Sequence, residues 1–246
     1  MTARLLLVHS PLVGCATWDL VAADLAGRGD EVGVPDLTGT LTAGPPYCRR
    51  QAQVIARSAS GRPAILIGHS GAGPLLAAAG AVIGQVRGYI FVDAGLPTPG
   101  QTWMETVPPD LAAQLQELAD ARGWLPPWPQ WWGEEAVAEL IPDPGARRRF
   151  AAGCPRLPLS MFGEVQPAAP HWPGAPAAYL LLSEAYEDQA ARARELGWPV
   201  TELASHHLAP LTDPGPVAES LRELLSQLQR LPGQAVTPWP DVTRAG

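Results

Sequence analysis

The stretch that decides the fold is LIGHSGAGPLL, residues 66–76. An apolar run ends at Gly68, a histidine and a serine follow, and small residues resume at Gly71. A buried strand that stops at a serine between glycines predicts a sharp turn, because only small neighbours let the chain double back there. The pattern G-x-S-x-small therefore predicts a strand, a tight turn at Ser70 and a helix that begins immediately after it.

The rest of the chain alternates short apolar runs with longer segments of helical character. The predicted strands lie at 4–9, 31–36, 64–69, 88–93, 178–183 and 199–204. The predicted helices lie at 16–28, 46–60, 71–84, 186–196 and 215–230. Such alternation is typical of a parallel sheet with helices on both faces, so we expect a six-stranded, doubly wound α/β core.

Two regions interrupt this alternation. A long insertion rich in proline and tryptophan separates the fourth and fifth strands, and its periodicity predicts helices at 109–122 and 133–141. The last residues are polar and contain prolines, which predicts a loose tail. We therefore divide the chain into a core of 1–95 and 176–230, a mostly helical cap of 96–175 and a tail of 231–246.

Composition excludes several classes of function. The net charge of −7 and the lack of a basic run argue against nucleic acid and membrane partners. All 17 basic residues are arginine, which excludes Schiff-base and P-loop lysine chemistry. The 3 cysteines form no CxxC motif, which predicts neither a zinc site nor a disulfide framework and favours a reducing cytoplasm. We also expect no metal and no cofactor. The apolar run near the N-terminus is too short for a signal peptide, so we expect a cytoplasmic protein. We also expect a monomer or homodimer.

A histidine late in the chain supplies a partner for Ser70. The segment SHHLAPLTDP, residues 205–214, follows the last predicted strand and precedes the last predicted helix. The side chain of a general base in that loop would reach Ser70, and a serine paired with a histidine is typical of nucleophilic catalysis. Of the two histidines we prefer His207 to His206, because Leu208 supplies the apolar residue that follows such a base.

With these parts the chain resembles the α/β-hydrolase superfamily from residue 4 to about 230. It looks most like small capped members that lack the first two strands of the full fold, such as the plant methylesterase and hydroxynitrile-lyase group. The resemblance implies Ser70 as the nucleophile and His207 as the base. It rests on LLLVHSPLVGCATWDLVAADLAGRGDEVGVPDLTG, LIGHSGAG, VRGYIFVDAGLP, the cap and HHLAPLTDP.

The acid of the expected triad departs from the family pattern. The family usually places an aspartate just after the strand that corresponds to 178–183, where this chain reads Ser-Glu-Ala-Tyr. Two carboxylates could replace it: Asp93, which ends the preceding core strand, and Glu184, one residue short of the usual position. We prefer Asp93, because haloalkane dehalogenases of this fold can carry their acid there. A third alternative is that another carboxylate, or none, orients the histidine.

The oxyanion hole is the second departure. The resemblance implies one N–H donor from Gly71 and a second from the loop after the first strand, but the matching residue there is Pro11, which has no N–H. Either the Leu12 amide replaces it or the Ser10 hydroxyl does, as a threonine does in the hydroxynitrile lyases. Losing one donor outright costs on the order of 3 kcal/mol of transition-state stabilisation.

The leading hypothesis is a serine hydrolase that cleaves a carboxylic ester, thioester or amide through an acyl-enzyme on Ser70. The alternative is a lyase or other non-hydrolytic catalyst, possible in natural-product biosynthesis, that uses His207 with Ser70 or Ser10. A non-catalytic binder of small apolar ligands is a third reading. Aromatic residues of the cap are expected to face a small apolar or aromatic substrate, and we select Trp128, Trp131 and Trp132.

Overall fold

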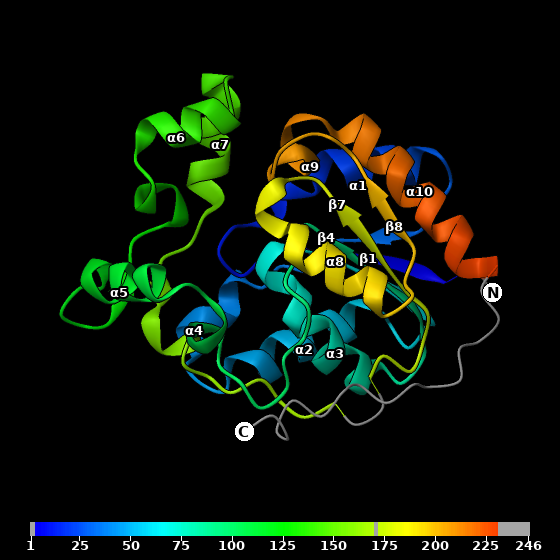
Figure 1. The fold of residues 1–246 in the computed structure, drawn as a ribbon, viewed down its shortest axis with the longest axis horizontal. Coiled ribbons are helices and arrows are strands. Elements are labelled where there is room, and N and C mark those ends of the chain that lie inside the picture. The colour runs from blue at the N-terminus through cyan, green and yellow to red at the C-terminus, as the bar shows by residue number, and fades with distance from the viewer. Residues whose placement is uncertain (1–2, 170–171, 231–246) are drawn as a thin grey trace.

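The computed structural model describes residues 3–169 and 172–230, so the predicted loose tail lies outside the described residues. Its centre is a six-stranded, all-parallel sheet in the order β2-β1-β3-β4-β7-β8 (Figure 1). The strands are β1 (Arg4–Val8), β2 (Val32–Gly33), β3 (Ala64–His69), β4 (Val86–Val92), β7 (Ala177–Leu181) and β8 (Val200–Glu202). The predicted parallel α/β core is confirmed.

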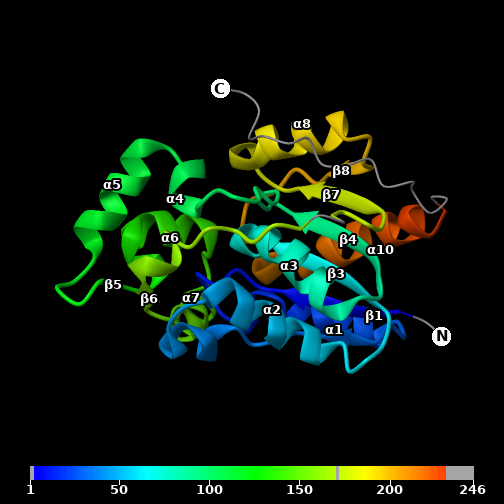
Figure 2. The same ribbon diagram turned by 90° about the horizontal axis from the view of Figure 1, so that it is seen from below.

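Helices cover both faces of the sheet (Figure 2). One apolar layer packs beneath α1 (Asp19–Gly27) and α10 (Pro214–Arg230), and the other beneath α2 (Tyr47–Ser58), α3 (Gly73–Ile83) and α8 (Glu187–Glu195). All six residues of β3 are buried, as a central parallel strand requires. The edge strands β2 and β8 are shorter than predicted, because each pairs on one side only and Pro35 has no N–H to extend β2.

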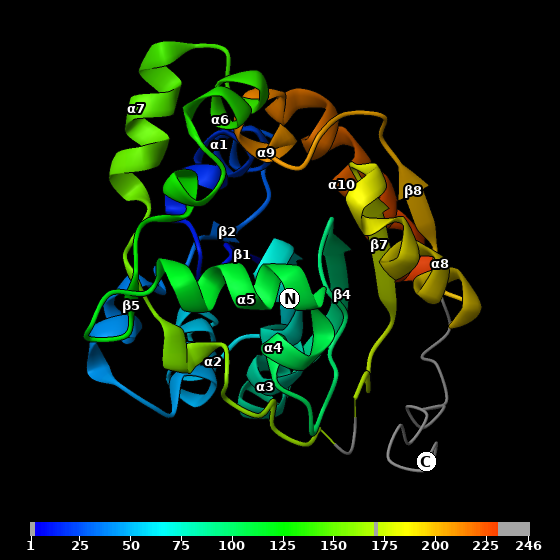
Figure 3. The ribbon, with the colours of Figure 1, turned by 60° about the vertical axis from the view of Figure 1, so that its left-hand side comes forward.

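Figure 3 shows the segment between β4 and β7, for which we predicted a cap. Its helices are α4 (Trp103–Thr106), α5 (Pro109–Leu118), α6 (Glu134–Leu140) and α7 (Pro144–Gly153). It also contains a short antiparallel pair, β5 (Trp124–Leu125) with β6 (Leu157–Pro158), which the sequence did not predict. The remaining elements are α9 (Ala209–Thr212) and 3₁₀ turns at Cys15–Thr17, Thr38–Ala43, Ser70–Ala72, Trp128–Trp131, Leu159–Met161 and Glu184–Tyr186.

The start and end of the cap are fastened together and to the core. The Gln166 side chain accepts from the Thr98 amide at 2.9 Å and donates to its hydroxyl at 2.8 Å. The Glu164 carboxylate accepts from the Tyr47 and Cys48 amides at 2.6 and 3.0 Å. These two amides are the first of α2, where unpaired N–H groups and the helix dipole favour a carboxylate.

The far half of the cap rests on the loop after β1. A Cβ on Gly14 would lie 2.5 Å from the Gly153 carbonyl oxygen, so only glycine fits at this crossing. Phe150 and Cys154 pack in one buried cluster with Val13 and Leu208. Of the helices in the described part of the chain, none combines the length and apolar character needed to cross a bilayer.

Candidate active site

Ser70 occupies the tight turn between β3 and α3. Its φ of +57° lies in the left-handed region, which a residue with a side chain adopts at a cost. The first residue of α3, Gly73, packs directly against the backbone of Gly95. A Cβ on Gly73 would lie 2.0 Å from the Gly95 carbonyl oxygen, so this close approach after the turn requires glycine. The strand-turn-helix predicted from residues 66–76 is therefore present, with the serine side chain at the carboxyl end of the sheet.

Three predicted side chains form a continuous hydrogen-bonded chain. Ser70 Oγ lies 3.0 Å from His207 Nε2, and His207 Nδ1 lies 2.8 Å from Asp93 Oδ2. An ionised carboxylate only accepts, so the network assigns the imidazole proton to Nδ1 and leaves Nε2 to accept from the serine hydroxyl. His207 comes from the loop before α9, and Asp93 directly follows β4.

Asp93 is held by more than the imidazole. Its Oδ1 accepts from the Leu182 and Ser183 amides at 2.9 and 3.0 Å, and its Oδ2 accepts from the Ser183 hydroxyl at 2.5 Å. The side chain is fully buried. Burial opposes ionisation, but the hydrogen bonds from His207, Ser183 and Leu182 outweigh it, so the pKa of the Asp93 carboxyl lies below its usual range.

The alternative acid and the alternative base lie elsewhere. Glu184 is exposed, and its side chain makes no hydrogen bond or ion pair within the described residues. His206 turns toward α9, where its Nε2 lies 3.0 Å from the Thr212 hydroxyl and its Nδ1 accepts from the Leu208 amide at 3.3 Å. The structure thus brings Asp93 and His207 to Ser70, and neither Glu184 nor His206.

The loop after β1 places a hydroxyl beside the Gly71 backbone. A Cβ on Gly71 would lie 2.9 Å from Ser10 Oγ, so these two residues are close neighbours. The Leu12 amide donates to Ser10 Oγ at 3.3 Å. This amide, one of the two predicted candidates for the second oxyanion donor, is therefore already engaged. A hydroxyl that accepts this hydrogen bond can still donate its own proton, so Ser10 remains a candidate donor.

A mostly apolar pocket opens beside Gly71 and runs beneath the cap. It has about 600 Å³ of space, its open mouth included. Pro11 and Leu12 line it from the core. Trp103, Met161 and Phe162 line it from the cap.

The profile of the Alpha/beta hydrolase family matches residues 5–220. The chain belongs to this family. The predicted family is therefore confirmed. Among curated proteins, none matches the sequence.

Several solved structures share the fold over more than nine-tenths of the chain. A pyrethroid hydrolase from Sphingobium faniae is 24% identical, with a TM-score of 0.68 over 94% of this chain and 100% of that one. An extracellular α/β-hydrolase from Paenibacillus, described as homologous to tobacco salicylic acid binding protein 2, is 18% identical with the same TM-score and coverage. Tomato methylketone synthase I is 15% identical, with a TM-score of 0.69 over 93% and 99%.

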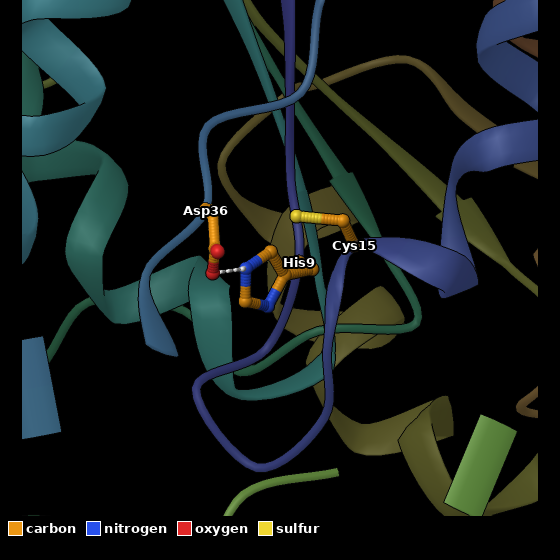
Figure 4. Close-up of side chains that lie close together, drawn as sticks. All are labelled: His9, Cys15 and Asp36. Carbon is orange, nitrogen blue, oxygen red and sulfur yellow. Dashed lines mark ion pairs between the residues drawn. The ribbon is translucent and has the colours of Figure 1, made fainter. Parts of the chain in front are cut away.

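Beyond the residues that the sequence selected, His9 holds the loop that carries Ser10. His9 Nδ1 lies 2.8 Å from the Ser10 carbonyl oxygen and Nε2 accepts from the Leu37 amide at 3.1 Å. Cys15 and Asp36 lie close enough to share one metal ion with it (Figure 4). Both His9 nitrogens are already engaged, however, and burial raises the pKa of the Cys15 thiol to about 11, so the cluster favours a structural role.

His69 is a second residue that sequence analysis did not select. Its Nε2 lies 2.8 Å from the His207 carbonyl oxygen and acts as the donor, which ties the base to the end of β3. Burial, reinforced by the neighbouring His207, lowers the pKa of His69, so this imidazole is neutral. Its Nδ1 has no partner among the described residues.

Tyr186 is the third, and it touches two members of the triad. Its ring stacks on the His207 imidazole, with centroids 5.0 Å apart and an angle of 5° between the planes. Its hydroxyl lies 3.5 Å from Ser70 Oγ. The sequence marked position 186 only as one that lacks the expected acid, and no local pattern indicates that a tyrosine there would reach the serine.

The three tryptophans selected for substrate contact do not line the pocket. Trp131 is buried and donates from its ring nitrogen to the Pro126 carbonyl at 2.8 Å, and Trp128 packs edge-on against Phe150. Trp132 is 43% exposed. The cap uses Trp128 and Trp131 for its own packing, and Trp103 supplies the aromatic wall of the pocket instead.

Proposed function

We propose that this α/β-hydrolase cleaves a carboxylic ester of a small to medium apolar substrate through an acyl-enzyme on Ser70. One observation carries the proposal: the serine hydroxyl is 3.0 Å from His207 Nε2 while the opposite ring nitrogen is 2.8 Å from a buried carboxylate. This is the arrangement in which an imidazole can take the serine proton and remain correctly oriented as it becomes charged.

In the acylation step, Ser70 Oγ attacks the ester carbonyl carbon while its proton passes to His207 Nε2. Asp93 stabilises the resulting imidazolium and does not itself take the proton. The tetrahedral intermediate then expels the alcohol oxygen, which receives the proton from Nε2. In deacylation a water follows the same route, so the products are a carboxylic acid and an alcohol.

Two donors are available for the negative oxygen of the intermediate. One is the Gly71 amide in the 3₁₀ turn before α3, and the other is the Ser10 hydroxyl, which lies beside Gly71. A hydroxyl replaces the amide that Pro11 lacks. The neutral state of His9 supports this role, because burial lowers its pKa and an imidazolium beside Ser10 would alter the loop's hydrogen bonds.

The pocket supports an apolar acyl or alcohol group. It lies between Gly71 and the cap residues Trp103 and Phe162, so an apolar chain or ring attached to the reacting carbonyl can be buried there, away from water.

A lyase that uses His207 as a base without an acyl-enzyme is the second candidate. The replacement of one amide donor by the Ser10 hydroxyl favours it.

A fluorophosphonate probe together with a panel of 4-nitrophenyl esters of increasing acyl length distinguishes these functions. A hydrolase should become labelled at Ser70, lose labelling in Ser70→Ala, and hydrolyse the esters with burst kinetics. Ser226→Ala is the matched control, because it removes a hydroxyl from the exposed face of α10, and it should behave as the wild type. Labelling at Ser70 without ester turnover would favour the lyase, and the absence of labelling would exclude a nucleophilic serine.

A further inference from the structure

Tyr186 lies at the reacting centre, although the triad is complete without it. Its hydroxyl is 3.5 Å from Ser70 Oγ, and its ring lies parallel to the imidazole that carries the proton. The residue belongs to the 3₁₀ turn that follows β7, and the amides of Leu182 and Ser183, which lie between that strand and the turn, bind the Asp93 carboxylate. The contacts to Asp93 therefore also fix the start of the segment that carries Tyr186.

The phenol can act only as a hydrogen-bond donor in this place. Burial raises the pKa of Tyr186, so the hydroxyl keeps its proton at neutral pH. Ser70 gives its own proton to His207 Nε2, which leaves the serine oxygen as an acceptor for the phenol. Asp93 is the carboxylate that faces His207, and His69 and His206 are the other titratable groups beside it.

The position of the phenol matches the place where the alcohol oxygen departs. In the tetrahedral intermediate the alcohol oxygen and Ser70 Oγ are bonded to the same carbon, and both must face His207 Nε2 to exchange its proton. A donor that reaches Ser70 Oγ from above the imidazole plane is therefore close to the alcohol oxygen as well. The Gly71 and Ser10 donors lie in the loops on which the carbonyl oxygen would rest.

We propose that the Tyr186 hydroxyl forms a leaving-group subsite, and that the enzyme is suited to esters of unactivated alkyl alcohols. The inference rests on the proposed ester hydrolysis. As the carbon–oxygen bond breaks, its electron pair goes to the alcohol oxygen, which accepts a hydrogen bond from Tyr186 and takes its proton from His207. The phenol proton stays on Tyr186 throughout.

The test is the dependence of rate on the leaving group. Wild type and Tyr186→Phe are assayed on one acyl group esterified to a series of alcohols that runs from 4-nitrophenol to ethanol. Phenylalanine keeps the ring that stacks on His207 and removes only the hydroxyl. We expect kcat/KM for the ethyl ester to fall about tenfold and that for the 4-nitrophenyl ester to change by less than about twofold, because a good leaving group needs no donor.

Tyr89→Phe is the matched control, because Tyr89 lies in β4 away from the triad and should leave the whole series unchanged. Equal losses on every ester, or no loss on any, would overturn the leaving-group role while leaving ester hydrolysis intact. A wild type that hydrolyses no ester in the series would remove the proposed function and this inference with it. A structure of Ser70 bearing an alkyl phosphonate gives an independent readout: the phenol should donate to the phosphonate alkoxy oxygen.

Discussion

Ser183 and His207 share one oxygen of Asp93. The Ser183 hydroxyl donates to Asp93 Oδ2 at 2.5 Å, and His207 Nδ1 contacts the same atom at 2.8 Å. The other oxygen accepts two backbone amides, so the carboxylate has four donors for its roughly four lone-pair sites. Asp93 is therefore fixed in orientation and in charge before any substrate binds.

Asp93→Asn should lower kcat by roughly 10²- to 10⁴-fold, because an amide can favour the wrong imidazole tautomer. Glu184→Gln is the control and should have a minor effect, since Glu184 is exposed and makes no contact with His207. Steady-state kinetics on any ester that the wild type hydrolyses would decide. A large loss in Glu184→Gln would mean that the acid had been misassigned.

The depressed pKa of Asp93 also makes stability depend on pH. A carboxyl whose pKa is lower in the folded protein stabilises it above the unfolded pKa, and this contribution is lost as pH falls through the folded value. Below about pH 4 the wild type should therefore lose stability more steeply than Asp93→Asn, which cannot titrate there. Urea unfolding at a series of pH values measures this difference, and parallel curves would contradict it.

Ser10→Ala should lower kcat by roughly 10²- to 10³-fold, because it removes the hydroxyl donor that replaces the missing Pro11 amide. KM should change little, since the hydrogen bond strengthens only as charge develops on the substrate oxygen. Ser160→Ala, in a cap turn where its hydroxyl pairs with Tyr47, is the control. Unchanged kcat in Ser10→Ala would show that the carbonyl oxygen is stabilised elsewhere.

Ser70→Gly should be more stable than Ser70→Ala by about 1 kcal/mol. Both variants lack the hydroxyl, but alanine keeps the side chain that makes a φ of +57° unfavourable, and glycine does not. Thermal unfolding of the two inactive variants measures the difference directly. Equal stability would indicate that the turn imposes no strain on the serine.

Glu164→Gln should destabilise the cap by about 1 kcal/mol, because the amide loses the charge that favours the start of α2 and has one acceptor oxygen where two are used. Limited proteolysis should cut residues 96–175 faster than in the wild type. Glu135→Gln, in the exposed first turn of α6, provides the control. Unchanged cleavage would locate the stability of the cap in its other contacts.

The core could be predicted because its signals are local. The run at 64–69 matches β3 residue for residue, and the G-x-S-x-small pattern marks the turn at Ser70 with no information from the rest of the chain. The pairing of a late histidine with this serine follows from the order of the elements. The family resemblance added the expected catalytic roles. Because Pro11 has no N–H, it also made Ser10 and Leu12 the candidates for the second oxyanion donor.

Other features depend on contacts between distant segments. Glu164 meets the start of α2 across 117 residues of sequence, and no periodicity in either segment indicates it. The placement of Tyr186 depends on where the turn after β7 is held, which Ser183 decides by binding Asp93. The lining of the pocket by Trp103 could not be predicted for a related reason, because composition shows that aromatic residues are present but not which way each ring faces.

The glycine crossing between the loop after β1 and the cap has a mechanical consequence. The Gly14 backbone rests directly against the Gly153 carbonyl, with no side chain between them to absorb a displacement. A shift of α7 is therefore transmitted to the segment that carries Ser10. Attempts to broaden the range of substrates by reshaping the cap should therefore hold residues 150–154 in place, because a movement there would displace the loop that carries Ser10.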